Sequence, residues 1–184
     1  MPELTPLTAL GGKTARIETL KGVRLIERPD IALASVAWRR DGGEADAHLR
    51  RALDMDVPGP RAFVTAAMTV FWTARAQWMV EAPIETHEDL AADLKSRLGA
   101  RASVVEQTDA WTCFDLSGAN LVAVMELLTN LDIRRMAPGT AERTSIHHLG
   151  AFVLVRGDRI SIYGPRSSAG SLHHAICTAI EAAL

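Results

Sequence analysis

The sequence predicts an α+β fold with antiparallel sheets and helices, built from two duplicated β-α-β-β-α (ferredoxin-like) units. The main observation is an internal repeat, because a shift of 82 residues aligns the strand-like segment Trp78–Pro83 with Ile160–Pro165. The same shift aligns two apolar helix stripes: Leu90, Leu94, Leu98 and Leu172, Ile176, Ile180. Chance is the alternative, since any two amphipathic helices share such a stripe. The matched prolines at the strand ends favour duplication, and two long copies indicate a supersecondary unit rather than a solenoid.

Length and composition limit the domain organisation and the partners. With 184 residues, of which 48% are hydrophobic and 23% charged, the chain can form one well-buried domain or two small fused ones. We expect an N-terminal arm over 1–22, a first half over 23–99 and a second half over 100–184 that together form one compact unit. A formal net charge of -2 provides no basic field, so nucleic acid is not an expected partner.

The start of the chain and its cysteines indicate a cellular compartment. Met1, Pro2 and Glu3 begin no signal peptide, and no apolar stretch is long enough to cross a membrane. Cys113 and Cys177 are too isolated in sequence for a disulfide framework or a CxxC pair. We therefore expect a cytoplasmic protein without a membrane partner.

Hydrophobic periodicity and turn residues place the elements of the first half. After the arm over 1–22, we expect strands over 23–27 and 31–38. A short helix should follow Asp41-Gly42-Gly43, with an apolar stripe of Leu49, Ala52 and Leu53. An extended pair over 63–73 and 78–82 and a helix over 86–99 complete the half. Thr86 and Asp89 have capping-box spacing, and Gly99 stands where a left-handed C-cap is favoured.

The second half repeats this alternation. We expect a long strand over 103–116, a helix striped by Leu121, Val124, Met125 and Leu128, a hairpin of strands over 144–155 and 159–163, and a last helix over 168–184. Ser117 and Gly118 are typical of a helix start. Gly157 and Asp158 fit a two-residue hairpin turn in which Gly adopts a positive φ.

Four of the six histidines form adjacent pairs, which raises the possibility of a metal site. Neighbouring residues diverge on both strands and helices, so neither His147 with His148 nor His173 with His174 chelates one ion alone. His173 and Cys177 share an i, i+4 spacing that offers two ligands. No second pair accompanies them, so the sequence favours a structural role and predicts no metal site.

A search for catalytic and cofactor motifs gives no catalytic residues and no cofactor in this chain. The sequence has no GxSxG elbow and no GxGxxG fingerprint, and both cysteines have apolar neighbours. Arg166, Ser167 and Ser168 form a candidate anion site, because backbone N–H groups and a guanidinium would converge at the start of the last helix. Helix capping explains the serines equally well.

The order of landmarks resembles the gamma subunit of heterotetrameric bacterial sarcosine oxidase over nearly the whole chain. The first-half landmarks are Leu25 to Pro29, Ile31 to Arg39, Ala45 to Leu53, Val57 to Pro60, Phe71, Trp72, Trp78, Met79 and Val80. The second-half landmarks are Val105 to Trp111, Leu116 to Gly118, Asp132, Pro138, Gly139, Arg143, Thr144, Ser161, Tyr163, Arg166, Ser167 and Ala169. The chain departs from the family at 73–77, where a Gly-Pro-Asp-Glu turn is usual, and at Asn130-Leu131, where a Cys-Pro pair is usual.

This resemblance implies a non-catalytic, interface-forming subunit that docks on the alpha subunit of a sarcosine oxidase, with beta and delta subunits in the complex. In that family FAD, FMN, NAD and tetrahydrofolate belong to the partner subunits, and the gamma fold is similar to that of aminomethyltransferases. For the docking surface we predict Trp72, Arg75 and Trp78 as anchors, with the arm from Thr5 to Lys13 as a second choice and self-association when isolated. The alternatives are a stand-alone folate-binding or aminomethyltransferase-like protein and a self-associating structural domain.

Overall fold

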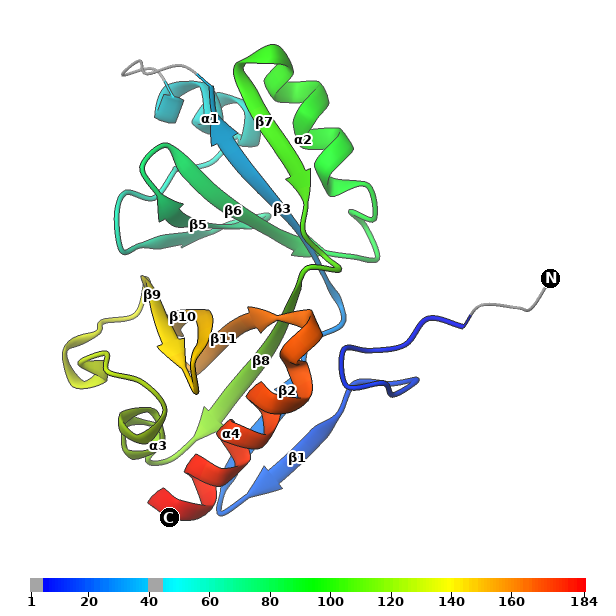
Figure 1. Cartoon of the computed structure of the whole chain (residues 1–184). Coiled ribbons are helices and arrows are strands. Elements are labelled where there is room, and N and C mark those ends of the chain that lie inside the picture. The colour runs from blue at the N-terminus through cyan, green and yellow to red at the C-terminus, as the bar shows by residue number, and fades with distance from the viewer. Residues whose placement is uncertain (1–4, 40–44) are drawn as a thin grey trace. The chain divides into compact units, whose positions relative to one another are not determined.

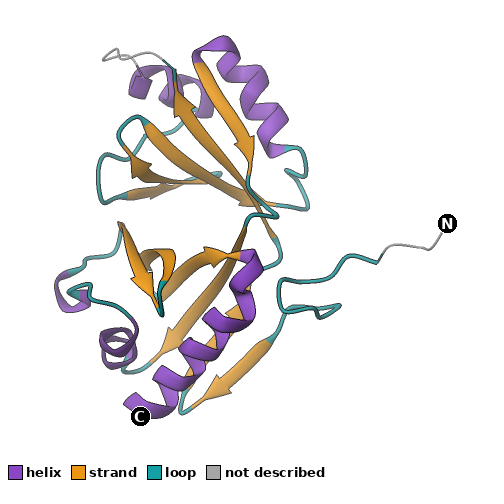
Figure 2. Cartoon of the chain, viewed as in Figure 1, coloured by secondary structure: helices purple, strands orange, loops and turns teal. Residues whose placement is uncertain are grey.

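The computed structural model describes residues 5–39 and 45–184 and confirms the α+β class (Figure 1, Figure 2). It contains a six-stranded sheet of order β1-β2-β8-β11-β10-β9 and a five-stranded sheet of order β4-β5-β6-β3-β7. The chain forms two compact units. Unit 1 comprises the described residues up to Pro29 with Ala110–Pro138 and Arg143–Leu184, and unit 2 comprises Asp30–Asp109 with Gly139–Glu142.

Unit 2 is a five-stranded sheet with two helices packed on one face. Its elements are β3 (Ile31–Trp38), α1 (Ala45–Leu53), β4 (Phe63–Thr65), β5 (Thr69–Ala74), β6 (Gln77–Pro83), α2 (Leu90–Leu98) and β7 (Ala102–Glu106), with a 3-10 turn at Gly99–Arg101. Alternate strand residues such as Ala34, Val36 and Val80 meet Leu49 of α1 and Leu94 of α2 in one buried cluster. The period of two on strands and about 3.6 on helices accounts for this core.

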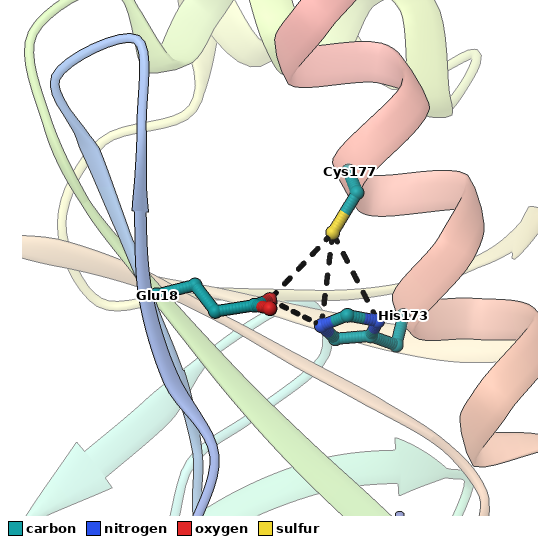
Figure 3. Close-up of side chains that lie close together, drawn as sticks. All are labelled: Glu18, His173 and Cys177. Atoms are coloured by element: carbon teal, nitrogen blue, oxygen red, sulfur yellow. Dashed lines mark hydrogen bonds and ion pairs between the residues drawn. The ribbon is translucent and has the colours of Figure 1, made fainter.

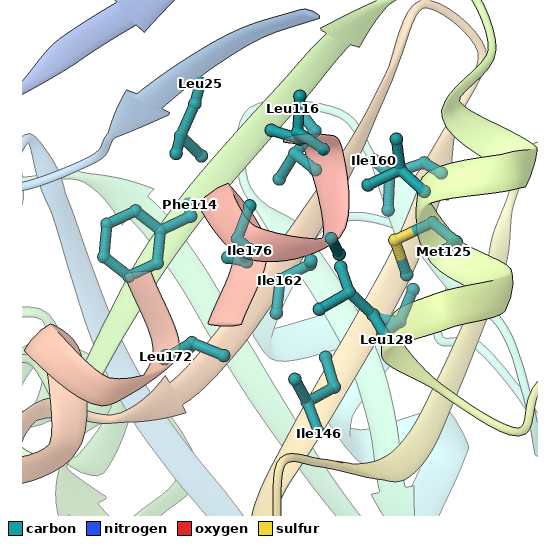
Figure 4. Packing of buried hydrophobic residues seen from close by; sticks show 14 of the residues in the cluster. Leu25, Phe114, Leu116, Met125, Leu128, Ile146, Ile160, Ile162, Leu172 and Ile176 are labelled. Atoms are coloured by element: carbon teal, nitrogen blue, oxygen red, sulfur yellow. The ribbon is translucent and has the colours of Figure 1, made fainter. Parts of the chain in front are cut away.

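Unit 1 has the same design with one strand more at the sheet edge. Its elements are β1 (Ile17–Leu20), β2 (Val23–Glu27), β8 (Trp111–Gly118), α3 (Leu121–Leu128), β9 (Thr140–Ile146, of which 140–142 group with unit 2), β10 (Leu149–Arg156), β11 (Arg159–Pro165) and α4 (Ala169–Ala183). In its core, Leu172 and Ile176 of α4 face Phe114, Leu116 and Ile162 of the sheet (Figure 4).

The duplication predicted from the 82-residue shift is visible in strand order and register. β3 pairs antiparallel with β6 through Ile31↔Pro83, and β8 pairs antiparallel with β11 through Trp111↔Pro165. In both units a helix follows the second strand of the hairpin, namely α2 after β6 and α4 after β11. Each unit therefore runs β-α-β-β-β-α, with one strand more between its helices than the β-α-β-β-α unit expected from the sequence.

The strand that closes each sheet comes from a different part of the chain. β7 is the first strand after α2 and pairs with β3, whereas β2 comes from the N-terminal region, long before β8, with which it pairs. The long strand expected over 103–116 is therefore two strands in two sheets, separated by residues 107–110. The halves expected at 23–99 and 100–184 differ from the observed units for the same reason, because β2 and β7 each pair outside the predicted half.

Several element boundaries also differ from the sequence prediction. α2 begins at Leu90 with Asp89 as its N-cap, so Thr86 precedes the helix and donates a hydrogen bond to the Pro83 carbonyl instead. α3 begins after Asn120, whose left-handed φ of 62° marks the N-cap, because β8 continues through Ser117 and Gly118. The start expected for α1 after Asp41-Gly42-Gly43 lies outside the described residues.

Turns account for the remaining differences. The strand expected over 144–155 is interrupted where His147 and His148 have φ of 47° and 69°, which makes a turn between β9 and β10. The β10–β11 hairpin is confirmed, with Arg156 paired to Arg159, but Gly157 is not among the residues of positive φ. Gly99 is the C-cap of α2 with a positive φ of 60°, but its ψ of -141° lies outside the left-handed helical region that the sequence predicted.

The N-terminal arm is partly built into the sheet rather than lying entirely on the surface. β1 pairs with β2, and the buried carboxylate of Glu27 accepts hydrogen bonds from the backbone N–H groups of Leu10 (2.9 Å) and Arg16 (3.1 Å). A buried carboxylate is stabilised when backbone donors satisfy its oxygens. Among the described helices, none is long and apolar enough to cross a membrane.

Candidate functional site

The chemically most distinctive cluster of unit 1 lies between strand β1 and helix α4 (Figure 3). Glu18 belongs to the edge strand β1, where it is paired with Leu25 of β2. His173 and Cys177 are four residues apart on α4, so their side chains leave the same face of the helix. Within 5–39 and 45–184, this is the one group of three His, Cys, Asp or Glu side chains whose ligand atoms converge.

The three ligand atoms lie within 4.8 Å of one another. His173 Nε2 is 2.7 Å from Glu18 Oε2, a hydrogen-bond distance. Cys177 Sγ is 3.6 Å from His173 Nε2 and 3.9 Å from Glu18 Oε2. The side chains of Glu18 and His173 are 24% and 11% exposed, so the cluster is half-buried and open to water on one side.

Electrostatics in the cluster favour an ionised Glu18 and a protonated Cys177. Burial raises the pKa of Glu18, but hydrogen bonds from Arg16 and His173 outweigh it, so the pKa falls below the ordinary value of 4.5. Burial raises the pKa of the Cys177 thiol, and the neighbouring Glu18 carboxylate raises it further. Cys177 is therefore a thiol at neutral pH when no cation binds beside it.

The geometry does not suit a nucleophilic relay of the Cys-His-Glu kind. In such a relay the acid holds one imidazole nitrogen while the thiol faces the other. Here Glu18 and Cys177 both lie nearest to Nε2 of His173, and the pKa of the thiol is raised rather than lowered. Convergence of three donor atoms on one point is the arrangement of ligands around a metal ion.

The sequence identified two of these three residues. His173 and Cys177 were recognisable by their i, i+4 spacing, but Glu18 lies 155 residues before His173. No local spacing could have indicated it, because its position depends on the β1–β2 pairing. His147 and His148 have ring centroids 5.8 Å apart in the β9–β10 turn and gain no third ligand among the described residues.

The predicted anion site at the start of α4 is engaged by the chain itself. Arg166 Nη2 donates a hydrogen bond to the Leu7 carbonyl at 2.8 Å, and the Arg166 backbone N–H donates to the Ala110 carbonyl. Ser167 is exposed, and Ser168 is the N-cap of α4 without a side-chain capping hydrogen bond. The observed role of Arg166 is to fasten the N-terminal arm to unit 1.

The predicted docking residues of the β5–β6 hairpin have different environments. Trp78 is 3% exposed, packs in the core of unit 2, and donates from Nε1 to the Pro58 carbonyl at 3.0 Å. Because this indole is buried and satisfied, Trp78 is a core residue and not an exposed anchor. Trp72 is half-buried and Arg75 is exposed in the turn, so these two remain candidates for a surface contact.

Unit 2 has a concave region between α1 and α2. Its lining residues are Trp38, His48, Arg51, Ala52, Arg97, Leu98 and Arg101. The rings of Trp38 and His48 stack at 5.5 Å, while Arg97 forms an ion pair with Asp93 at 2.7 Å. Within 5–39 and 45–184, the residues of this lining include three arginines and no carboxylate.

Comparison with known proteins relates the fold to that of sarcosine oxidase and aminomethyltransferase chains. One chain of heterotetrameric sarcosine oxidase from Corynebacterium sp. U-96, solved in complex with pyrrole 2-carboxylate, aligns with a TM-score of 0.75 and 18% identity. The alignment covers 90% of this chain and 87% of that chain.

Glycine cleavage system aminomethyltransferase T from Bartonella henselae aligns with a TM-score of 0.62 and 16% identity. The alignment covers 86% of this chain but 46% of the transferase, so the chain spans less than half of that enzyme. No protein-family model and no curated protein matches the chain. The likeness to these two structures establishes a shared fold.

Proposed function

We propose that this chain is a non-catalytic accessory subunit of a flavin-dependent heterotetrameric sarcosine oxidase, which docks on the large alpha subunit and supports assembly. The observation that carries the proposal is the mutual coverage with a chain of heterotetrameric sarcosine oxidase, 90% of one and 87% of the other. A match over nearly the whole of both chains is what equivalent subunits produce. In this proposal FAD, FMN, NAD and tetrahydrofolate are held by the partner subunits.

The alternative is a stand-alone folate-binding or aminomethyltransferase-like protein. The alignment with the transferase covers 46% of that enzyme, against 87% of the sarcosine oxidase chain. A folate site also needs a deep apolar pocket with a carboxylate for the pterin ring. Among the described residues, the lining of the pocket between α1 and α2 includes three arginines and no such carboxylate.

Within the proposed complex, the tip of the β5–β6 hairpin is our first choice for the docking surface. Trp72 presents a partly exposed indole and Arg75 an exposed guanidinium, the residue types enriched at the centres of interfaces. The exposed large apolar side chains of the described residues lie elsewhere, among them Leu7 of the arm (52%), Val105 of β7 (53%) and Leu127 of α3 (58%). The arm therefore stays the second choice.

Co-expression with an alpha subunit tests the proposal. A tagged copy of this chain should co-elute stoichiometrically with a co-expressed sarcosine oxidase alpha subunit, and flavin absorbance should appear in the complex alone. Trp72→Ala combined with Arg75→Ala should weaken co-elution, whereas Gln77→Ala, an exposed change on the same hairpin, should not.

Two results would reject the proposal. Stoichiometric FAD or FMN in the isolated chain, or sarcosine-dependent peroxide formation by it, would make it an enzyme in its own right. Tight binding of tetrahydrofolate by the isolated chain, without co-elution of any alpha subunit, would favour the folate-binding alternative. Full co-elution of the Trp72/Arg75 double variant would reject the hairpin and direct attention to the arm.

A further inference from the structure

The geometry points to a divalent metal site in unit 1, in which Glu18, His173 and Cys177 bind one zinc-type cation and leave a fourth position open to solvent. This inference departs from the sequence expectation of no metal, because Glu18 supplies the third ligand that spacing could not reveal. It rests on the cluster itself and holds whether or not the chain joins an oxidase.

The separations of the donor atoms fit a single small cation. Ligands placed tetrahedrally at metal bonds of about 2.0–2.3 Å are about 3.3–3.7 Å apart. The observed separations are 2.7, 3.6 and 3.9 Å, so each ligand needs to move by only a few tenths of an ångström. The shortest, between Glu18 and His173, widens when the ion replaces the hydrogen bond.

The donor set selects the kind of metal. One thiolate, one imidazole and one carboxylate suit borderline cations such as Zn²⁺ or Co²⁺, and disfavour Mg²⁺ and Ca²⁺, which prefer oxygen ligands. On binding, the thiol proton of Cys177 is released to solvent, and the imidazole proton of His173 moves from Nε2 to Nδ1. The metal-bound ligands are then an anionic sulfur, a neutral nitrogen and an anionic oxygen.

The surroundings hold the ligands in place. His173 is 9% exposed, and its ring lies 5.8 Å from that of the fully buried Phe114, which restricts its rotation. Arg16 donates hydrogen bonds to Glu18 Oε1, leaving Oε2 directed at His173. An orienting partner of this kind is typical of metal ligands. Bound metal would fasten the edge strand β1 to helix α4.

Cobalt titration of the full chain tests the site, with Co²⁺ as a spectroscopic substitute for Zn²⁺. We expect one Co²⁺ per chain, with visible d–d bands of a low-coordinate ion and a near-ultraviolet charge-transfer band from thiolate to metal. Zn²⁺ should displace the cobalt and remove both signals. No cobalt spectrum at excess metal, or an octahedral spectrum without a charge-transfer band, would overturn the proposal.

Matched variants assign the ligands. Cys177→Ser should abolish the charge-transfer band, and His173→Gln and Glu18→Gln should each weaken binding by more than the ~10–100-fold typical of outer-shell changes. The controls are His174→Gln, Glu181→Gln and Cys113→Ala, which change an exposed histidine and glutamate of α4 and the other cysteine. A band that survives Cys177→Ser or disappears with Cys113→Ala overturns the assignment.

Circular dichroism separates lost ligation from lost folding. If His173→Gln unfolds the chain, Cys177→Ser decides alone, because sulfur replaced by oxygen keeps the size of a half-buried side chain while removing the thiolate band. Binding by a folded Cys177→Ser variant with the affinity of the original chain would show that the metal sits elsewhere and would reject the proposal.

Discussion

In unit 2 the outer neighbour of β3 is the strand that follows the second helix of the unit, whereas in unit 1 the equivalent neighbour of β8 is a strand from the start of the chain. β7 begins four residues after α2 ends, at Ala102 after Leu98, and pairs with β3. In unit 1 the same position beside β8 is taken by β2. The two copies therefore share a plan but depend on different segments for completion, which makes the N-terminal region part of the core of unit 1.

The joint between the second helix and the closing edge also differs between the copies. Lys95 of α2 occupies the position 82 residues before Cys177 of α4. Its ammonium donates to the carbonyls of Gly99 (2.7 Å) and Ala102 (2.9 Å), which satisfies the helix end and the first residue of β7. In unit 1 this role passes to side chains that meet Glu18 of β1. At this repeated position unit 2 has a lysine that caps the helix end, whereas unit 1 has a cysteine that belongs to the Glu18–His173–Cys177 cluster.

The largest effect is expected from a charge placed in β2, the N-terminal strand that pairs with β8 in unit 1. Leu25 of β2 is 1% exposed in the core of unit 1, so Leu25→Asp should destabilise that unit by about 3–5 kcal/mol through an unpaired buried charge. The neighbouring exposed Arg24→Asp is the control and should cost little. Peptide-resolved hydrogen exchange should show loss of protection in β8 and β11 with β3 and β6 retained. Equal loss in both units would contradict the idea that β2 belongs energetically to unit 1.

A somewhat smaller effect is expected at Asp115, a buried charge of unit 1 that has no buried charged counterpart among the described residues of unit 2. Asp115 is 4% exposed and binds Arg28 (2.5 Å), Arg159 (3.0 Å) and the Ser161 hydroxyl (2.5 Å). Asp115→Asn leaves two guanidinium groups without their carboxylate and should cost about 3 kcal/mol. The position 80 residues earlier is Ser35, and Ser35→Ala should stay within about 0.5 kcal/mol. Hydrogen exchange in β8 and β3 measures the stability of both units. Similar losses of protection in the two variants would show that the contacts of Asp115 with Arg28 and Arg159 add no specific stability to unit 1.

The repeat was visible in the sequence because core positions keep their chemistry in both copies. Leu90 and Leu172 mark equivalent helices, and the prolines at 83 and 165 mark equivalent strand ends. What could not be predicted was which copy each outer strand joins, since alternation of side chains defines a buried face but no partner. The stretch 103–116 shows this, because strand-forming residues lie on both sides of 107–110, where the backbone passes from one sheet to the other.

The sequence likewise predicted only part of the candidate site, namely the pair on helix α4. The i, i+4 spacing of His173 and Cys177 follows from helix geometry and is readable in any helix. Glu18 is positioned by tertiary structure, as is the burial that makes Trp78 a core residue instead of a docking anchor. Residues whose roles depend on contacts distant in sequence escape local pattern analysis for this reason.

A moderate effect is expected where the two copies differ by one methyl group. A Cβ added at Gly164 of β11 would lie 2.5 Å from Leu172 Cδ2, whereas the equivalent position in unit 2 is already Ala82. Gly164→Ala should therefore cost about 1–2 kcal/mol through overpacking against α4. Ala82→Gly should cost about 1 kcal/mol, from the lost methyl and the added backbone freedom. A stabilised Gly164→Ala variant would show that Leu172 adjusts freely and that α4 packs less tightly than α2.

The smallest effect is expected at Glu18, where it should depend on pH. Because the pKa of Glu18 is lower in the folded chain than the ordinary value of 4.5, its contribution to stability is present above that value and disappears as the pH falls through the folded pKa. With a chelator present, Glu18→Gln should thus be less stable than the original chain at neutral pH, and the difference should shrink as the pH falls below the ordinary pKa of 4.5. Urea unfolding at several pH values measures this, with Glu181→Gln, a change of an exposed glutamate on α4, as the control variant. A stability difference that does not change with pH would mean that Glu18 stabilises the contact between β1 and α4 through packing and not through its charge.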